Sequence, residues 1–203
     1  MEAPDFELMS KPGYRLVDYQ VVITPHEDLR NRILAVKKEI SDKYNLQYFR
    51  SKPHITLVRF KVWEMMEEKI MNQLKVVAMG TPPFKMHLKD FGSFPTHTIF
   101  IKAESQVPIQ QMQMALRCIK KLARTQDHEP HFLNEPFISI AQKIPSEVFD
   151  KAWPEYSHRH FTAHFIADHM TVLKRKEGDM GFRIVDNLQF ENLPVYVKQG
   201  DLF

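Results

Sequence analysis

A chain of 203 residues, 43% hydrophobic and 26% charged, is long enough to bury a substantial core as one domain or as two small lobes. No apolar run approaches the roughly 20 residues that a membrane span needs, and the N-terminus lacks the basic and then apolar order of a signal peptide, so we expect a cytoplasmic protein without a membrane partner. A single cysteine excludes a disulfide framework, and a net charge of +3 fits phosphate-bearing partners without requiring them.

Strand and helix patterns alternate through the first part of the chain. Residues 14–23 are rich in β-formers, and the run Thr24-Pro25-His26-Glu27 follows them. This run has an N-cap threonine, a proline for the first helical position and a glutamate three residues after the cap, so it predicts a capping box. The apolar stripe of the helix that it opens consists of Leu29, Ile33, Val36, Ile40 and Tyr44. A second stripe predicts another helix over 63–77.

The second part of the chain repeats this order. We expect strands over 84–91 and 98–103, a helix from Pro108, a strand from Phe137, a short helix capped by Ser146 and one long strand over 161–173. The two series indicate one domain, residues 1–203, with a first lobe over 14–97 and a second over 98–182. The tail, residues 183–203, is apolar enough to pack on the body, and we assign it no activity.

The run Pro53-His54-Ile55-Thr56-Leu57 is the stretch most typical of a chemical site. Alternation along a strand places His54 and Thr56 on one face and the apolar residues on the other. An imidazole can give or take a proton near neutral pH, and a hydroxyl two residues away can hydrogen-bond an anionic oxygen of the same substrate. His54 and Thr56 are therefore candidate functional residues, although a lone strand histidine is more often a surface or packing residue.

The same frame recurs 83 residues later in the run Pro136-Phe137-Ile138-Ser139-Ile140. The proline, the isoleucine and the hydroxyl residue keep their places, so Ser139 corresponds to Thr56. Phe137 stands where the histidine would be, and phenylalanine can neither donate nor accept a proton. The recurrence indicates a duplication that brings the two strands together.

With these two frames, the turn Gly92-Ser93-Phe94-Pro95 and the run from Asp168 to Leu173, the chain resembles the 2H phosphoesterases, which include the 2′-5′ RNA ligases. The resemblance covers roughly residues 14–174. It implies an α+β fold of two lobes, each a β-α-β-α-β unit, in which two antiparallel sheets face a central cleft and the helices lie outside. Each lobe of that fold supplies one His-x-Thr frame.

The resemblance also implies an activity, because members of this family open or form phosphodiester bonds at RNA 2′,3′ positions without a metal. His54 would then be an acid–base residue, and Thr56 and Ser139 would hold the phosphate, with no cofactor. The partner would be an RNA terminus or a nucleotide cyclic phosphate, and no obligate protein partner is inferred. Loss of one positioned acid or base costs ~10²–10⁴ in rate, so we expect Phe137 to impair catalysis. The alternative is a family member that binds RNA or nucleotide without turning it over.

His169 is the candidate for a substitute acid or base. It shares a strand face with Thr171, and it would reach the cleft if this strand neighboured the Phe137 strand. The other interpretation of His169 is a structural, hydrogen-bonded role. Cations beside the motif strands are candidates for phosphate binding or, alternatively, ordinary surface charge; they are Lys52, Arg59 and Lys143.

A third hypothesis is a metal-dependent hydrolase. His158, His160 and His164 have the same strand parity, and three histidines on one face can hold Zn²⁺. The chain contains no His-Glu-x-x-His run and no pair of cysteines, so we expect no metal site.

Overall fold

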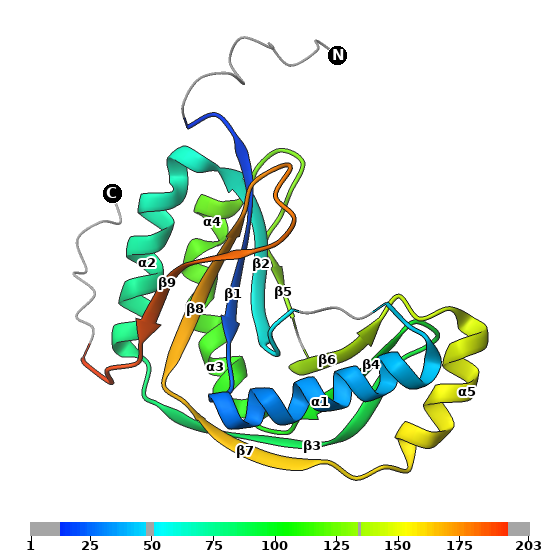
Figure 1. Cartoon of the computed structure of the whole chain (residues 1–203). Helices are drawn as coiled ribbons and strands as arrows, with labels where there is room; N and C mark the ends of the chain where they lie inside the picture. The colour runs from blue at the N-terminus through cyan, green and yellow to red at the C-terminus, as the bar shows by residue number, and fades with distance from the viewer. Residues whose placement is uncertain (1–12, 48–50, 134, 195–203) are drawn as a thin grey trace.

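The computed structural model of the chain describes residues 13–47, 51–133 and 135–194 (Figure 1). The strands are β1 Leu16–Ile23, β2 Ile55–Trp63, β3 Phe84–Phe94, β4 Thr98–Ala103, β5 His131–Phe132, β6 Phe137–Gln142, β7 Thr162–Ala167, β8 His169–Arg175 and β9 Arg183–Gln189. The helices are α1 Glu27–Tyr44, α2 Glu67–Gly80, α3 Gln106–Leu116, α4 Lys120–Ala123 and α5 Ser146–Ser157.

The strands form two antiparallel sheets. One has five strands in the order β5-β2-β1-β8-β9, and the other has four in the order β6-β4-β3-β7. Figure 1 shows the two sheets at an angle to each other, with the helices outside them. β2 and β6, which carry the two repeated frames, approach each other where the sheets meet. The α+β class of two antiparallel sheets is therefore confirmed.

The expected boundary between the lobes at residues 97 and 98 does not separate the two sheets. β3 lies before this boundary but pairs with β4 after it, and β8 lies after the boundary but pairs with β1. The physical reason for the first exchange is the short connection between β3 and β4, because two strands joined by so few residues pair as a hairpin in one sheet. The lobes therefore exchange strands.

The long strand expected over residues 161–173 is two strands in two sheets. β7 pairs with β3, and β8 pairs with β1, with Asp168 at the break between them. The alternation of buried residues changes parity there, since Phe165 and Ala167 are buried before the break and Met170 and Val172 after it. A change of parity turns the apolar face to the other side, which a continuous strand cannot do.

The first helix begins later than the capping box predicts. α1 starts at Glu27 with His26 at the N-cap position, and no side chain makes a cap hydrogen bond there. The apolar stripe of α1 packs against β6 of the four-stranded sheet, while α3 packs against β2 of the five-stranded sheet. α1 and α3 thus each cover the sheet to which the strand before them does not belong.

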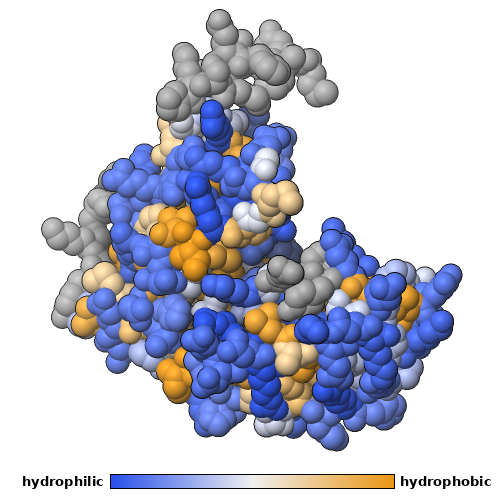
Figure 2. Space-filling view, in the orientation of Figure 1, coloured by the Kyte–Doolittle hydropathy of each residue, from blue (hydrophilic) through white to orange (hydrophobic). Residues whose placement is uncertain are grey.

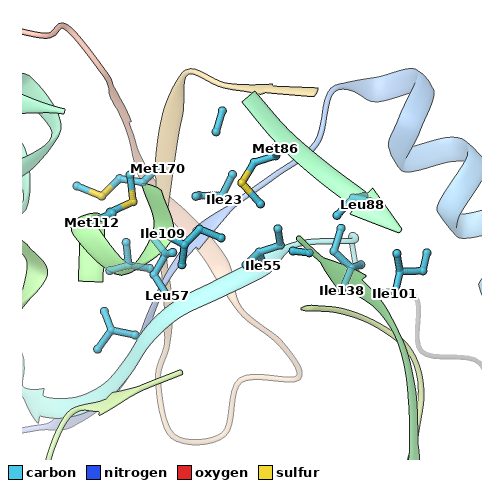
Figure 3. Close-up of a cluster of buried hydrophobic side chains, with 14 of the residues drawn as sticks. Ile23, Ile55, Leu57, Met86, Leu88, Ile101, Ile109, Met112, Ile138 and Met170 are labelled. Carbon is cyan, nitrogen blue, oxygen red and sulfur yellow. The ribbon is translucent and has the colours of Figure 1, made fainter. Parts of the chain in front are cut away.

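One core connects the two sheets. In Figure 3, Ile55 of β2 lies between Ile23 of β1 and Ile138 of β6, with Met86 and Leu88 of β3 nearby. All five side chains are almost fully buried. The central isoleucine of each repeated frame therefore points into the shared core, which fixes the side of the strand on which the other residues of the frame lie.

The first part of the tail packs on the body, as expected. β9 forms the edge of the five-stranded sheet, and the ring of Phe190 stacks on Phe84 with the ring centres 6.1 Å apart. Residues 195–203 lie outside the described part of the chain. Figure 2 shows a mostly hydrophilic surface with an apolar patch over β9, where Ile184 and Val185 are exposed. Among the described helices, none has the length and apolarity required to cross a membrane.

Candidate functional site

His54 lies directly before β2, and the burial of Ile55 turns His54 and Thr56 to the other face of the strand. Both of these side chains are half-buried. The Nδ1 atom of His54 lies 2.8 Å from the carbonyl oxygen of Lys52. Because a carbonyl oxygen only accepts hydrogen bonds, Nδ1 carries the proton and Nε2 is the nitrogen that can exchange one.

The surroundings of His54 favour its neutral form. Burial lowers the pKa of the imidazole, and the positive charge of Lys37 lowers it further, against the opposing effect of the hydrogen bond to Lys52. A neutral imidazole with an available Nε2 can accept a proton at neutral pH. His54 thus has the state required of a general base.

Lys37 is a residue of this site that the sequence reasoning missed. Its side chain on α1 is only 5% exposed, and its Nζ donates to the carbonyl oxygen of Ser51 at 2.8 Å and to the Ser51 hydroxyl at 3.1 Å. Burial lowers the pKa of Lys37 to about 8. The sequence did contain a signal for the burial of Lys37. Lys37 lies on the apolar stripe of the helix, four residues after Ile33 and three before Ile40.

The second frame presents aromatic rings in place of an imidazole. Phe137 lies on β6, and its ring centre is 5.2 Å from that of Phe94 and 4.8 Å from that of Phe100. Ser139 lies opposite Phe100 in the ladder between β4 and β6. Ile138, which lies between Phe137 and Ser139 in the chain, is fully buried. This part of the site offers a hydroxyl and apolar rings but no group that can transfer a proton.

The three candidate phosphate-binding cations differ in their surroundings. Lys52 is exposed directly before the first frame, and Lys143 is exposed directly after β6. Arg59 instead makes a bidentate ion pair with Asp18 at 3.1 and 2.6 Å, and Arg175 contacts the same carboxylate at 2.7 Å. Burial alone would raise the pKa of Asp18, but the hydrogen bonds from the two guanidinium groups hold it below its usual value.

His169 lies at the start of β8, which is two strands from β2 in the five-stranded sheet and not beside β6. The hypothesis that its strand neighbours the Phe137 strand is therefore wrong. Its Nδ1 lies 2.6 Å from Asp168 Oδ1, and its Nε2 lies 3.4 Å from the Thr24 hydroxyl. His169 is thus part of the sheet that carries His54.

The three histidines of the metal hypothesis do not gather. His158 contacts the carbonyl oxygen of Pro154, His160 contacts Asp90, and His164 lies beside His87. Among the described residues, no group of three or more histidine, cysteine, aspartate or glutamate side chains is arranged to hold a metal ion.

Two antiparallel sheets whose meeting strands carry a repeated Pro-x-Ile-hydroxyl frame, with a histidine in the first copy and Phe137 in the second, are typical of the 2H phosphoesterase class. Residues 25–179 match the family model of the 2′-5′ RNA ligase superfamily, and the chain belongs to that family.

A curated relative is similar in sequence, and solved structures share the fold. The chain is 29% identical over 127 residues to a candidate phosphoesterase of Bacillus cytotoxicus, covering 61% of this chain and 69% of that protein. The structure of TT0787 of Thermus thermophilus is similar with a TM-score of 0.60 at 14% identity, over 86% of this chain and 98% of that chain. E. coli LigT, solved with 3′-AMP, is similar with a TM-score of 0.58 at 12% identity, over 87% and 98%.

Proposed function

We propose that this protein is a metal-independent phosphodiesterase that acts on RNA or nucleotide 2′,3′-cyclic phosphates or 2′-5′ phosphodiester bonds, at a rate reduced by Phe137. The observation that carries the proposal is the state of His54. Burial lowers the pKa of its imidazole, its Nδ1 is held by the Lys52 carbonyl, and a hydroxyl from Thr56 lies on the same strand face. A histidine in this state can take a proton from a water molecule beside a phosphate that the hydroxyl binds.

The remaining candidates have roles in the same proposal. Thr56 and Ser139 donate hydrogen bonds to the phosphate oxygens, and the exposed ammonium groups of Lys52 and Lys143 attract the anion. Arg59 contributes less, because Asp18 already neutralises part of its charge. The complex of E. coli LigT with 3′-AMP supports a nucleotide as ligand.

A second candidate function is nucleotide or RNA binding without turnover. The cluster of Phe94, Phe100 and Phe137 favours it, because aromatic rings at the place of the second imidazole can stack on a base but cannot transfer a proton. The two candidates differ in whether the wild-type protein cleaves what it binds.

The first test measures hydrolysis of a 2′,3′-cyclic nucleotide by the wild type, His54→Ala and Phe137→His. We expect slow hydrolysis by the wild type, none by His54→Ala, and a rate increase of ~10²-fold for Phe137→His, the low end of what a positioned acid or base contributes. The matched control is the double variant that combines Phe137→His with His54→Ala, which should lose this rate increase. A folded Phe137→His protein that binds no nucleotide would overturn the proposal.

The second test asks whether the activity requires a metal ion. The proposed chemistry assigns proton transfer to side chains, so dialysis against EDTA should leave the rate unchanged. Loss of activity on chelation, with recovery on addition of Zn²⁺, would contradict the metal-independent mechanism and favour the metal-dependent hydrolase.

A further inference from the structure

His169 and His54 lie at the same level of the five-stranded sheet, in one row that runs across the strands from β2 through β1 to β8. Val22 on β1 is opposite Thr56 on β2 and also opposite Thr171 on β8. Residues opposite each other in an antiparallel ladder have their side chains on the same face of the sheet. His54 and His169 each precede their threonine by two residues, so both lie on this face, towards the same end of the sheet.

The spacing of the two strands suits one phosphate between the imidazoles. Only β1 lies between their strands, so the backbones are two strand spacings apart, about 10 Å. In-line displacement at phosphorus places the attacking and the leaving oxygen on opposite sides, and each needs a proton-transferring nitrogen about 3 Å away. Two side chains that extend from strands at this spacing can flank such a group.

The rings are held in the same way. The carboxylate of Asp168 accepts from Nδ1 of His169 at 2.6 Å, just as the Lys52 carbonyl accepts from Nδ1 of His54 at 2.8 Å. In both residues Nε2 is left as the nitrogen that exchanges a proton. Asp168 also prevents the ring from turning over, as an orienting carboxylate does for a catalytic histidine.

The Nε2 atom of His169 is within reach of a substrate. The His169 side chain is 26% exposed. The neighbour of Nε2 is the hydroxyl of Thr24 at 3.4 Å, a long contact that a substrate oxygen can replace. Thr24 is not engaged in capping α1, because that helix begins only at Glu27 and makes no side-chain cap bond.

We propose that His169 is the second acid–base residue of this site, in place of the imidazole that Phe137 cannot supply. The inference rests on the proposed function. Nε2 of His54 takes a proton from water, whose oxygen forms a new bond to phosphorus. The bond from phosphorus to one ribose oxygen breaks, and the proton on Nε2 of His169 passes to that oxygen. The product is a nucleotide phosphomonoester, and both histidines return to their starting states by exchange with solvent.

The test compares two leaving groups in His169→Gln. We expect hydrolysis of a 2′,3′-cyclic nucleotide to fall by ~10²-fold, because the ribose oxygen needs a proton to leave. Hydrolysis of a nucleoside 4-nitrophenyl phosphodiester, whose leaving group is stable as an anion, should fall by less than about fivefold. A purely structural role of His169 would lower both rates equally. Binding of 3′-AMP should change by less than about threefold, since His169 acts on the transition state.

Two further variants control the test. His164→Gln removes an exposed histidine from β7 and should leave both rates unchanged. In the Phe137→His background a second imidazole is available, so the added His169→Gln change should cost less than about threefold on the cyclic substrate. A thermal unfolding curve for each variant reports whether it is folded.

The outcomes separate the two proposals. Full activity in His169→Gln, with no activity in His54→Ala, would overturn the role of His169 and leave the proposed function standing. A wild-type protein that binds nucleotide without cleaving it would also overturn the role of His169, because His169 would then not be acting as a proton donor. A wild-type protein that neither binds nor cleaves nucleotides would overturn the proposed function itself.

Discussion

Among single residues, Lys37 acts most directly on the proposed base. Its buried ammonium is held by two hydrogen bonds to Ser51, three residues before His54. A positive charge at this place disfavours a second positive charge on the imidazole, and it adds to the effect of burial in lowering the pKa of His54. Burial, with the charge of Lys37 added to it, therefore lowers the pKa of His54 and favours the neutral ring that can accept a proton.

Replacing this charge should raise the pKa of His54. In Lys37→Met the positive neighbour is absent while the burial of the ring remains, so we expect the pKa of His54 to rise but to stay below its ordinary value. NMR titration of the His54 ring protons measures it, and the acidic limb of the rate profile should move to higher pH by the same amount.

The matched control is Lys38→Met on the same helix, where the exposed Lys38 pairs with Asp42. That variant should leave the His54 titration where it is in the wild type. A pKa of His54 that stays unchanged or falls in Lys37→Met would contradict the electrostatic role of Lys37.

At the scale of elements, the pairing of β3 with β4 positions the aromatic cluster beside Ser139. Gly92 on β3 lies opposite Phe100 on β4, and Phe100 lies opposite Ser139 on β6. A Cβ atom added at Gly92 would be only 2.5 Å from the Phe100 ring. The glycine therefore leaves the space in which Phe100 packs against Phe94 and Phe137.

Gly92→Ala should consequently destabilise the protein, although alanine is the better strand residue. The Phe100 ring has to move towards its neighbours in a packed cluster, and such overpacking costs about 1–3 kcal/mol. Chemical denaturation measures the loss. Gly181→Ala is the control, because a Cβ there meets nothing within 4 Å, and its free energy of unfolding should stay within about 0.5 kcal/mol of the wild type. Equal stabilities of the two variants would show that the cluster adapts freely.

For the whole molecule, buried titratable groups determine how stability depends on pH. Lys37 has a pKa of about 8 when folded and its ordinary value of 10.5 when unfolded. Below pH 8 both states carry the proton and folding must bury the charge, so this cost disappears as pH rises from 8 to 10.5. Burial acts in the opposite way on Tyr156, whose pKa it raises to about 12, so the unfolded state gains stability from tyrosine ionisation above pH 10.

We therefore expect the free energy of unfolding to rise by roughly 2 kcal/mol between pH 7 and 10 and to fall again above pH 10. Urea unfolding at a series of pH values measures the curve. Lys37→Met should abolish the rise but keep the fall, which separates the two groups. A stability that decreases steadily from pH 7 would contradict the burial of a charged Lys37.

The amino-acid sequence alone determined most of the helices, several of the strands and the first frame of the site. Apolar stripes at helical spacing predicted α1, α2 and α3, and alternation predicted β2 and β6, because local side-chain periodicity is set by the backbone geometry of each element. The same alternation identified the frame of His54 and Thr56. Ile55 between them is buried in the core, so the two polar side chains lie on the other face of the strand. The family followed from the same residues and their recurrence at Phe137 and Ser139.

Only the tertiary structure decided which strands share a sheet and which charges share a site. The pairing of β8 with β1 joins segments far apart in sequence, which local periodicity does not specify. The same pairing brings His169 into the row of His54 and releases Thr24 from the cap that its sequence neighbours predicted. Lys37 lies beside His54 because a helix crosses to the other sheet, and its pKa depends on burial that only this packing creates.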